Sequence, residues 1–569
     1  MKSEEIIYRG SASDDKEISQ EVFEESKKSN KILNPEIEKL VDNYSEELVL
    51  SKQGYTPIHV DEIASKLAHI YEKIRKIIDW KDDNALRRGA IERVLKRILF
   101  PKLSNFSKKH VDSKKLAETV TLELIRGGHL PNDEVPMERV STVAKALDKY
   151  LIFLKYLSTY KNFEVKEKNN FATFVMEIAA CEIEEILTNP IKEIGVMSAM
   201  TESLNNRITI IPQNSLTPEE KLRQIKIATE RTLYDLDDNY VVYQILKQQY
   251  PNWKEMDIEF AGEVAKELPK VWKNIYKKID ILSSKRFTAV AEKVDTVFML
   301  LGDVLEQLKE KPREMKSILE NKEEFKKLFT NSYEKRFATL KTRLLHLAIF
   351  STLSVFLSNW FTFFVIEVPL AHLFYEGFNL VAAIVDFLIP TFVMFLLVIT
   401  IKPPKEDNLK KVLSTTMSFI YQGEGQEHYQ IETQKKHFNI FNVIMTTLYG
   451  LTSIAIFYGI AYVFYISHLP ITSVIFDTLT IALTVYAAVV IRNQSKELNV
   501  DEGRTPRDFI LDIITVPIAK VGSILAKKWK EYNVAASFFN FVIEAPLVTI
   551  LDFIQGWSEY IKERKSELH

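Results

Sequence analysis

Two long apolar segments dominate the pattern of hydrophobic and polar positions along this chain. They occupy residues 344–366 and 378–401, and neither contains Lys or Arg. Each is about as long as a helix needs to cross the ~30 Å hydrocarbon core of a bilayer. The pattern therefore predicts a transmembrane hairpin over residues 344–401, with a short turn at 367–377.

A second apolar pair follows at residues 440–467 and 470–491, which predicts a second hairpin over 440–492. Neither turn contains Lys or Arg, whereas the opposite flanks contain many. Because Lys and Arg are enriched in cytoplasmic loops, we expect four crossings with both termini in the cytoplasm. The flanking residues are Lys335, Arg336, Lys341, Arg343, Lys402, Lys405, Lys410, Lys411, Lys435, Lys436, Arg492, Lys496, Arg504 and Arg507.

The chain ahead of the first hairpin has the pattern of packed amphipathic helices, because apolar residues recur every three or four positions. One strand-like run, 205–212, interrupts this pattern. Thr217 then stands where it would cap a helix that begins at Pro218. We expect a helical cytoplasmic domain over 33–212 and a second helical section over 213–311.

A stalk helix is predicted over residues 312–343. Apolar residues keep helical spacing from Met315 to Leu344, and neither Pro nor Gly occurs between Pro312 and the first apolar segment. The simplest interpretation is one helix that enters the bilayer without a joint. The alternative is a helix that breaks near Arg343.

Carboxylates inside the predicted crossings are the strongest candidates for function. Asp386 and Asp477 lie at matched depth on two different helices, and Glu367 and Glu376 lie near the outer mouth. A carboxylate in the hydrocarbon layer is costly unless it is protonated, paired or hydrated. One hypothesis is therefore an acid-lined outer vestibule on an ion path. The alternatives are protonated Asp side chains bonded to nearby Ser and Thr, or caps at helix breaks.

Hydroxyl side chains also line the predicted crossings. Ser351, Ser354 and Ser358 share one face of the first helix, and Thr480 and Thr484 share a face of the fourth with Asp477. Small and hydroxylated residues allow close approach of neighbouring helices. We interpret these stripes as helix-packing faces.

The segment between the hairpins, 402–439, is predicted to be an amphipathic cytoplasmic linker that lies on the membrane surface or on the soluble domain. Glu424, His428 and Glu432 would share one face if this part were helical. Three such residues on an exposed face are usually solvated, so we predict no metal site.

The C-terminal segment, 508–569, is too apolar for ordinary surface helices and too interrupted for a confident crossing, so we expect interfacial or re-entrant helices. Pro517 and Pro546 are the predicted break sites. A short echo, FVIEVPL at 364–370 and FVIEAPL at 541–547, adds Pro369 and Glu544 to these candidate helix-break sites. An inverted repeat would give such an echo, but seven residues are too few to distinguish it from chance.

The composition of the chain narrows the classes of partner and fold that fit the sequence. The chain of 569 residues has 75 basic and 77 acidic residues, a net charge of −2, which does not favour nucleic acid as a partner. Its 16 Gly and 19 Pro are too few for a turn-rich β fold. Residues 1–32 lack an apolar core, so we expect a disordered tail and no cleaved signal peptide.

The single cysteine, Cys181, lies among acidic residues. Glu177, Cys181 and Glu184 share one helical face. A buried carboxylate pair is one interpretation, and a solvated acidic face is the preferred one. Cys181 has no nearby His to activate it, so we expect a packed thiol that is not a nucleophile.

These patterns predict an all-α, polytopic membrane protein with a large N-terminal helical cytoplasmic domain. The function that fits best is a non-catalytic, homo-oligomeric membrane scaffold whose cytoplasmic domain binds a protein partner. The alternative is a cation channel or transporter. No catalytic constellation, cofactor site or metal site is predicted from the sequence.

Overall fold

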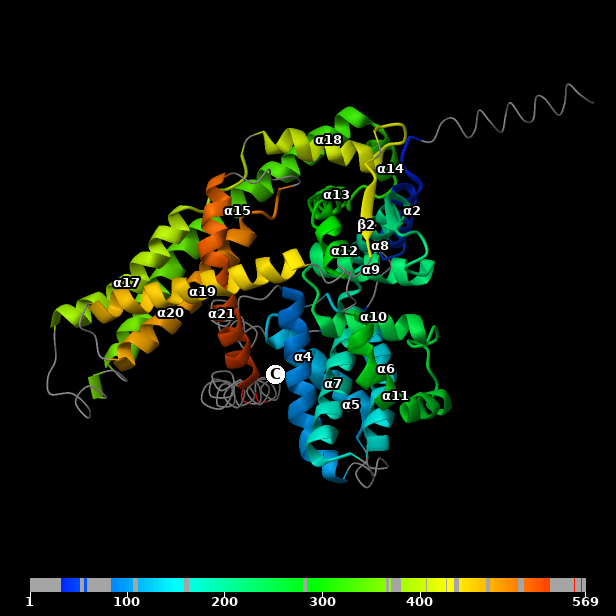
Figure 1. Ribbon diagram of the computed structural model, residues 1–569. Coiled ribbons are helices and arrows are strands. Elements are labelled where there is room, and N and C mark those ends of the chain that lie inside the picture. Colours follow the sequence, from blue (N-terminus) through cyan, green and yellow to red (C-terminus); the bar gives the residue numbers. More distant parts are fainter. Residues whose placement is uncertain are drawn as a thin grey trace, which may run out of the picture.

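Most of the chain folds into helices. Helices make up 80% of the structure, and 18 of them lie in the described residues, labelled as in Figure 1. The predicted helical fold is thus confirmed, with one small two-stranded sheet as an addition. The computed structural model describes residues 32–51, 56–58, 83–105, 111–132, 134–157, 163–279, 284–364, 368–369, 380–405, 407–425, 427–433, 440–466, 471–499, 506–532, 557 and 564.

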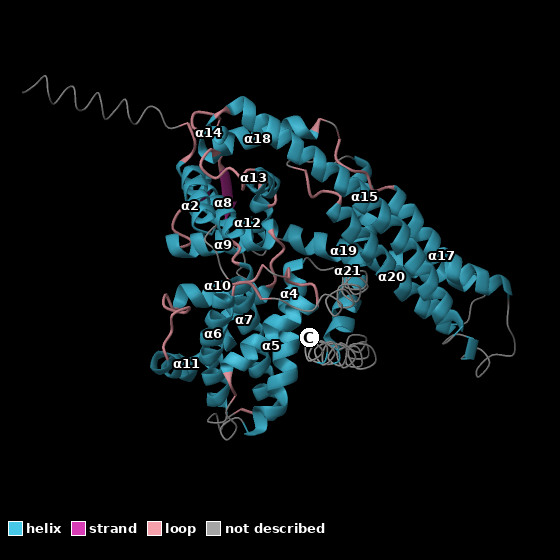
Figure 2. Ribbon diagram, turned by 180° about the vertical axis from the view of Figure 1, so that it is seen from behind, coloured by secondary structure: helices cyan, strands magenta, loops and turns pink. Residues whose placement is uncertain are grey.

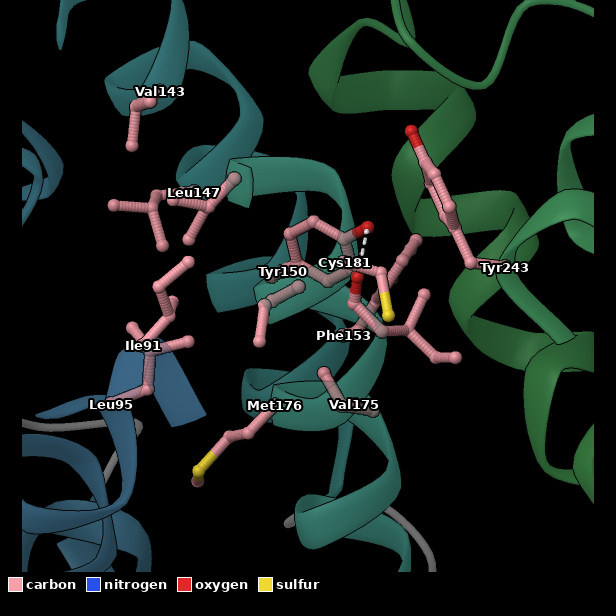
Figure 3. Packing of buried hydrophobic residues seen from close by; sticks show 14 of the residues in the cluster. Ile91, Leu95, Val143, Leu147, Tyr150, Phe153, Val175, Met176, Cys181 and Tyr243 are labelled. Atoms are coloured by element: carbon pink, nitrogen blue, oxygen red, sulfur yellow. Dashed lines mark hydrogen bonds between the residues drawn. The ribbon is translucent and has the colours of Figure 1, made fainter. Parts of the chain in front are cut away.

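The first hydrophobic core is built by residues between Ile58 and Ile279. Helix α7 is central to it, because α7 packs against α4, α6 and α10 and buries side chains on nearly every side. Figure 3 shows side chains of α4, α6 and α7 meeting in this core. Its helices are α4 (Asp83–Leu99), α5 (Ser113–Arg126), α6 (Met137–Tyr156), α7 (Val165–Thr188), α10 (Asp238–Gln249) and α11 (Ile258–Ile279), with a 3-10 turn at Phe100–Asn105.

Several helix ends follow local sequence signals. The Asp112 carboxylate accepts hydrogen bonds from the first backbone N–H groups of α5, and Gly127 ends that helix. Thr217 caps α9 (Pro218–Leu233), with Pro218 in the first turn, as predicted. Other helices start without such a signal: the N-caps of α6 and α8 are Pro136 and Pro190, which offer no side-chain hydrogen bond.

The second hydrophobic core joins residues that are far apart in sequence, from Leu33 to Leu498. Residues on both sides of position 212 contribute to it, because α8 packs against α9 as well as α2. Its helices are α2 (Pro35–Ser51), α8 (Ile191–Arg207), α9, α12 (Ser284–Ala291), α13 (Asp295–Gln307), α14 (Met315–Glu320), α18 (Asn408–Ile420) and the first half of α15 (Lys322–Thr362).

The segment between the hairpins belongs to this second core. Val412, Phe419 and Tyr421 are at most 1% exposed, so α18 packs on the helices of the second core, as one of the two predicted positions requires. Strand β2 (Tyr429–Glu432) pairs in parallel with β1 (Ile208–Ile211), which confirms the predicted strand-like run. Because Glu432 lies in a strand, Glu424, His428 and Glu432 do not share a helical face.

Helix α15 links the second core to the apolar helices. It runs for 41 residues from Lys322 to Thr362, with the Asn321 side chain accepting a hydrogen bond at its start. It passes through Arg343 without interruption, so the predicted continuity at that point is confirmed and a break near Arg343 is wrong; the predicted unbroken helix from Pro312 is wrong, because the chain is extended at Asn321. It begins ten residues after Pro312, because the separate short helix α14 comes first.

The apolar helices gather on one side of the molecule (Figures 1 and 2), and α17 and α20 contribute Met394, Val398, Ala488 and Ile491 to the second core. Among the residues that the structure describes, four helices are long and apolar enough to span a membrane, which indicates a multi-pass membrane protein. They are α15, α19 (Ile440–Ile466), α20 (Ile471–Gln494) and α21 (Pro506–Tyr532). The second predicted crossing forms α17 (Leu380–Ile399), and its side chains are described only from Leu388 onward.

Helix α21 corrects the prediction for the C-terminal segment. It is one helix of 27 residues that continues through Pro517, so Pro517 does not end it. An interior proline costs about 3 kcal/mol, and packing against α20 offsets that cost. At Gly522 the two helices approach so closely that a Cβ would overlap the Ala482 carbonyl oxygen. Pro546 and Glu544 lie outside the described residues.

The second core should be sensitive to loss of side chains from the soluble half of α15. Phe329 is fully buried there, so Phe329→Ala is expected to lower the free energy of unfolding by about 3–5 kcal/mol. Thermal melting of the purified full-length protein measures the change. Lys327→Ala, an exposed position on the same helix, is the control and should melt like the unmodified protein. Equal melting of both variants would contradict this packing.

Candidate functional site

The predicted membrane carboxylates are only partly placed by the structure. Asp477 lies on α20 and is 5% exposed, on the same buried face as Ile481 and Thr484. Asp386 belongs to α17, but its side chain lies outside the described residues, as do Glu367 and Glu376. Pro369 is described and exposed. The vestibule formed by these carboxylates stays a prediction.

One predicted packing stripe is wrong in its register. Ser351 and Asn359 of α15 are each 8% exposed, whereas Ser354 and Ser358 are exposed. The buried positions are therefore spaced by eight residues, two turns apart on the face that meets α17 and α20. The prediction assigned these serines to one face because they are all small and hydroxylated. In the structure, the position of a residue around the helix decides whether it is buried, whatever its polarity.

A polar cluster, which we call the junction, lies where the apolar helices meet the second core. It joins the turn that follows α20 to α13, α15 and α18. The Thr296 hydroxyl donates to the Glu497 carbonyl oxygen over 2.9 Å, and the Asn408 amide donates to the Leu498 carbonyl oxygen over 2.6 Å. The same amide donates to the Tyr333 hydroxyl over 3.1 Å. Backbone carbonyls of this turn are thus held by two helices of the second core.

Ion pairs reinforce the junction along α15. The Arg336 guanidinium donates to Asp303 of α13 over 2.8 Å and lies 3.7 Å from the Glu497 carboxylate. Arg343, two turns further along α15, also pairs with Glu497. Burial alone would lower the pKa of Arg336, but the hydrogen bond and charge of Asp303 raise it above its ordinary value. Arg336 therefore stays charged and fixes α15 against both α13 and α20.

The junction also contains a carboxyl that titrates near neutral pH. Burial raises the pKa of Asp295 to about 7, against a hydrogen bond from the Thr296 backbone N–H that lowers it. The charges of Glu292 and Glu497 add to the rise. This residue begins α13, so its charge state acts directly on the helix that Arg336 contacts.

Sequence reasoning did not find the junction. Arg336 and Arg343 were recognised only as positive flanks of a crossing, and Glu497 was not singled out. The sequence did contain a signal. Glu497 lies one turn beyond the end of an apolar helix, and Arg336 and Arg343 precede another apolar segment. Contacts between residues more than 150 positions apart are not visible in a single sequence.

The acidic segment of α7 corrects a second prediction. Glu182, Glu184 and Glu185 are at most 5% exposed, so the preferred interpretation of a solvated acidic face is wrong. The Glu182 carboxylate accepts hydrogen bonds from Lys149 (2.9 Å), the Tyr150 hydroxyl (2.6 Å) and the Trp253 indole (2.8 Å). Because every partner is buried and paired, this cluster is a structural element of the first core.

Cys181 lies in the same core and is 1% exposed. Figure 3 shows its thiol among apolar side chains beside Tyr150. Burial raises the pKa of the Cys181 thiol well above its ordinary value, and this outweighs the charge of Arg88, which lowers it. The predicted packing of the Cys181 thiol is therefore confirmed. Within the described ranges, no group of three His, Cys, Asp or Glu residues is placed to hold a metal ion.

Comparisons with known proteins add no identification. No family model, no curated protein and no solved structure matches this chain.

Glu230 of α9 gives the soluble part of the chain a predicted pH dependence. It is 2% exposed, and burial raises its pKa from 4.5 to about 8, against the charge of Lys226. Between these two values the folded protein keeps a proton that the unfolded chain has lost, so stability falls as pH rises. Above pH 8 the stability that the protonated Glu230 carboxyl contributes is fully lost.

The variant Glu230→Gln removes this titration. At pH 8 this variant is expected to melt at a higher temperature than the unmodified protein. The difference in unfolding free energy between the two proteins should be larger at pH 8 than at pH 5, by more than about 1 kcal/mol. Melting temperatures at both pH values measure the effect, and Glu219→Gln, an exposed position in the same helix, is the control. A pH-independent difference between the variants would show that Glu230 is already ionised in the folded protein.

Proposed function

We propose that this chain is a non-catalytic, homo-oligomeric membrane scaffold. Its soluble helical part binds a protein partner in the cytoplasm, and its apolar helices fix that part to the bilayer. The observation that carries the proposal is α15, one helix that contributes to the second core at one end and to the apolar helices at the other. A helix of this kind transmits position and orientation without a joint.

The surface of the apolar helices supports placement in a lipid bilayer. Large hydrophobic side chains are more than half exposed along α15 and α19, which is unusual for a surface in contact with water. They include Leu345, Ile349, Phe350, Leu357, Trp360, Phe361, Ile444, Leu448, Leu451, Ile454, Tyr458 and Tyr465. The positive flanks of the crossings favour the cytoplasm for the soluble part.

The packing around α15 supports a fixed geometry between the two parts. Phe325, Phe329 and Leu340 are at most 3% exposed in the second core, and α17 packs along the far half of the helix. The junction adds Arg336 and Arg343 as ionic contacts at the point of transition. A partner bound to the soluble part would therefore be held at a set distance from the membrane.

Rigid coupling through α15 is testable by distance measurement. Spin labels on Lys327→Cys and Leu353→Cys, both exposed positions, should lie about 39 Å apart, with a narrow distribution, at about 1.5 Å per residue. Double electron–electron resonance on the full-length protein in nanodiscs measures this distance, and the native Cys181 is buried. Lys341→Pro should broaden the distribution, whereas the matched variant Lys341→Ala should not.

A broad distribution in the unmodified protein would overturn the rigid-coupling argument. A narrow distribution that survives Lys341→Pro would show that contacts other than α15 fix the two parts. Native mass spectrometry of the same preparation tests the oligomer, and a monomer at all concentrations would remove that part of the proposal.

A cation channel or transporter is the second candidate. The observation that favours it is the burial of the Asp477 carboxyl in a helix that is long and apolar enough to cross a membrane. Cation flux into liposomes that contain the purified protein separates the two candidates. The scaffold proposal expects flux no higher than in empty liposomes.

Flux that is lost in Asp477→Asn, and kept in the control variant Asp407→Asn outside the apolar helices, would replace the scaffold with an ion path. Flux that is equal in both variants would exclude Asp477 from that path. Because removal of one charge from a narrow path costs several kcal/mol, a drop of at least about tenfold is the expected size of a positive result.

A further inference from the structure

A row of exposed lysines, which we call the basic strip, lies where α15 and α17 leave the apolar part of the molecule. Lys341 of α15 is exposed, and one and two turns further along the same face Leu345 and Ile349 are 59% and 55% exposed. Ile399, the last residue of α17, is 60% exposed, and the exposed Lys402 follows three residues later. The strip therefore adjoins the exposed apolar surface of both helices. Its members are Lys335, Lys341, Lys402, Lys405, Lys410 and Lys411.

Contacts of neighbouring residues bring the lysines of α15 and those of the connection after α17 together. The Asn408 amide, at the start of α18, donates to the Tyr333 hydroxyl of α15 over 3.1 Å, so this end of the connection lies beside α15 (Figure 1). The other end leaves α17, which packs against α15 and shares the second core with Leu344 through Val398. Residues 400–407 therefore run along the stretch of α15 between Tyr333 and Leu344.

Two prolines fix the connection between α17 and α18. Pro403 and Pro404 separate Lys402 from Lys405, and Pro404 is buried while both lysines are exposed. A proline ring restricts the backbone to one narrow range of φ, so this stretch has little freedom to move. The two ammonium groups are thus attached to backbone that is already ordered, which lowers the entropy cost of binding a ligand.

The basic strip carries positive charge that the protein itself does not neutralise. Residues 335–347 and 401–411 contain six Lys and two Arg against two acidic residues. Both arginines belong to the junction, where they pair with Glu497. None of the six lysine side chains has an ion pair or hydrogen bond within the described part of the chain, whereas Lys322 and Lys326 near the start of α15 each pair with a glutamate. The strip is therefore suited to a negatively charged partner.

The depth of the strip in a bilayer identifies that partner. Along a helix that rises about 1.5 Å per residue, Lys341 lies about 6 Å from Leu345, and the headgroup layer on each side of the hydrocarbon core is about 5–8 Å thick. The Lys341 ammonium therefore lies in the headgroup layer when Leu345 contacts acyl chains. Anionic phospholipids attract cytoplasmic lysines that lie close to the membrane surface, and each such lysine contributes about fivefold in affinity.

We propose that the basic strip binds the phosphate headgroup of an anionic phospholipid, whose acyl chains lie on the exposed apolar faces of α15 and α17. Lys341 and Lys402 contact the phosphate, since they are the lysines of the strip nearest to exposed apolar side chains, and the other four add to the attraction. Lipid binding at the strip rests on the membrane placement within the proposed function, and it needs neither the oligomer nor the protein partner. A lipid bound in this way would hold the connection after α17 against α15 at the membrane surface.

Native mass spectrometry of the delipidated full-length protein in detergent micelles tests the strip with two lipids that have the same acyl chains, phosphatidylglycerol and phosphatidylcholine. Phosphatidylglycerol is expected to bind saturably and at least about tenfold more tightly than phosphatidylcholine, because only the first carries a net negative charge. Glycerol 3-phosphate, which offers the phosphate without acyl chains, is the third probe and should not displace phosphatidylglycerol at equal concentration.

A matched pair of double variants assigns the binding to the strip. Lys341→Gln combined with Lys402→Gln should weaken phosphatidylglycerol binding by about 25-fold and leave phosphatidylcholine binding unchanged. Lys322→Gln combined with Lys326→Gln removes the same charge from the soluble end of α15 and should bind phosphatidylglycerol like the unmodified protein. None of the four side chains is buried, so both double variants should keep the melting temperature of the unmodified protein.

Equal affinity for the two lipids in the unmodified protein would overturn the proposal, as would equal weakening in the two double variants, which would show a general effect of net charge. Displacement by glycerol 3-phosphate would assign the strip to a soluble anion instead of a lipid. The same spectra report the oligomer. A monomer that prefers phosphatidylglycerol removes the oligomer from the proposed function and keeps the lipid site, and an oligomer without this preference does the reverse.

Discussion

The continuity of backbone hydrogen bonds through α15 is the constraint on which the rest of the structure depends. Within a hydrocarbon layer an unsatisfied N–H or C=O group costs several kcal/mol, so a chain enters as an intact helix. Helix α15 meets this condition with 41 residues and no Pro or Gly. Its soluble half supplies Phe325 and Phe329 to the second core, and its apolar half lies against α17. The second core and the apolar helices are therefore joined by one uninterrupted helix.

The sequence was sufficient for features that local chemistry decides. The cap at Thr217 and the unbroken helix through Arg343 depend on neighbouring residues, and both were predicted. The strand-like run predicted over 205–212 contains the strand at 208–211, but its pairing partner, Tyr429–Glu432, was not predicted. The helical class followed from hydrophobic spacing. Apolar length likewise indicated α19 and α20, because a crossing helix needs only its own side chains to be recognised.

Prediction failed where partners distant in sequence decide the outcome. Glu182 resembles a surface residue until Lys149 and Trp253 surround its carboxylate. Pro517 resembles a helix end until α20 packs beside it. Arg87 and Arg88 carry no motif, and only the fold shows that both contact Glu184. Burial, rather than residue type, determines the chemistry of each of these groups.

The second core has a consequence for the order of biogenesis. It requires residues 33–44, which are synthesised first, and also Phe419 and Leu498, which the ribosome adds only after the first apolar hairpin and after α20. Until then the early helices lack their last neighbours and expose apolar surface. The second core can therefore be completed only after the residues of α20 and of the turn that follows it have been synthesised.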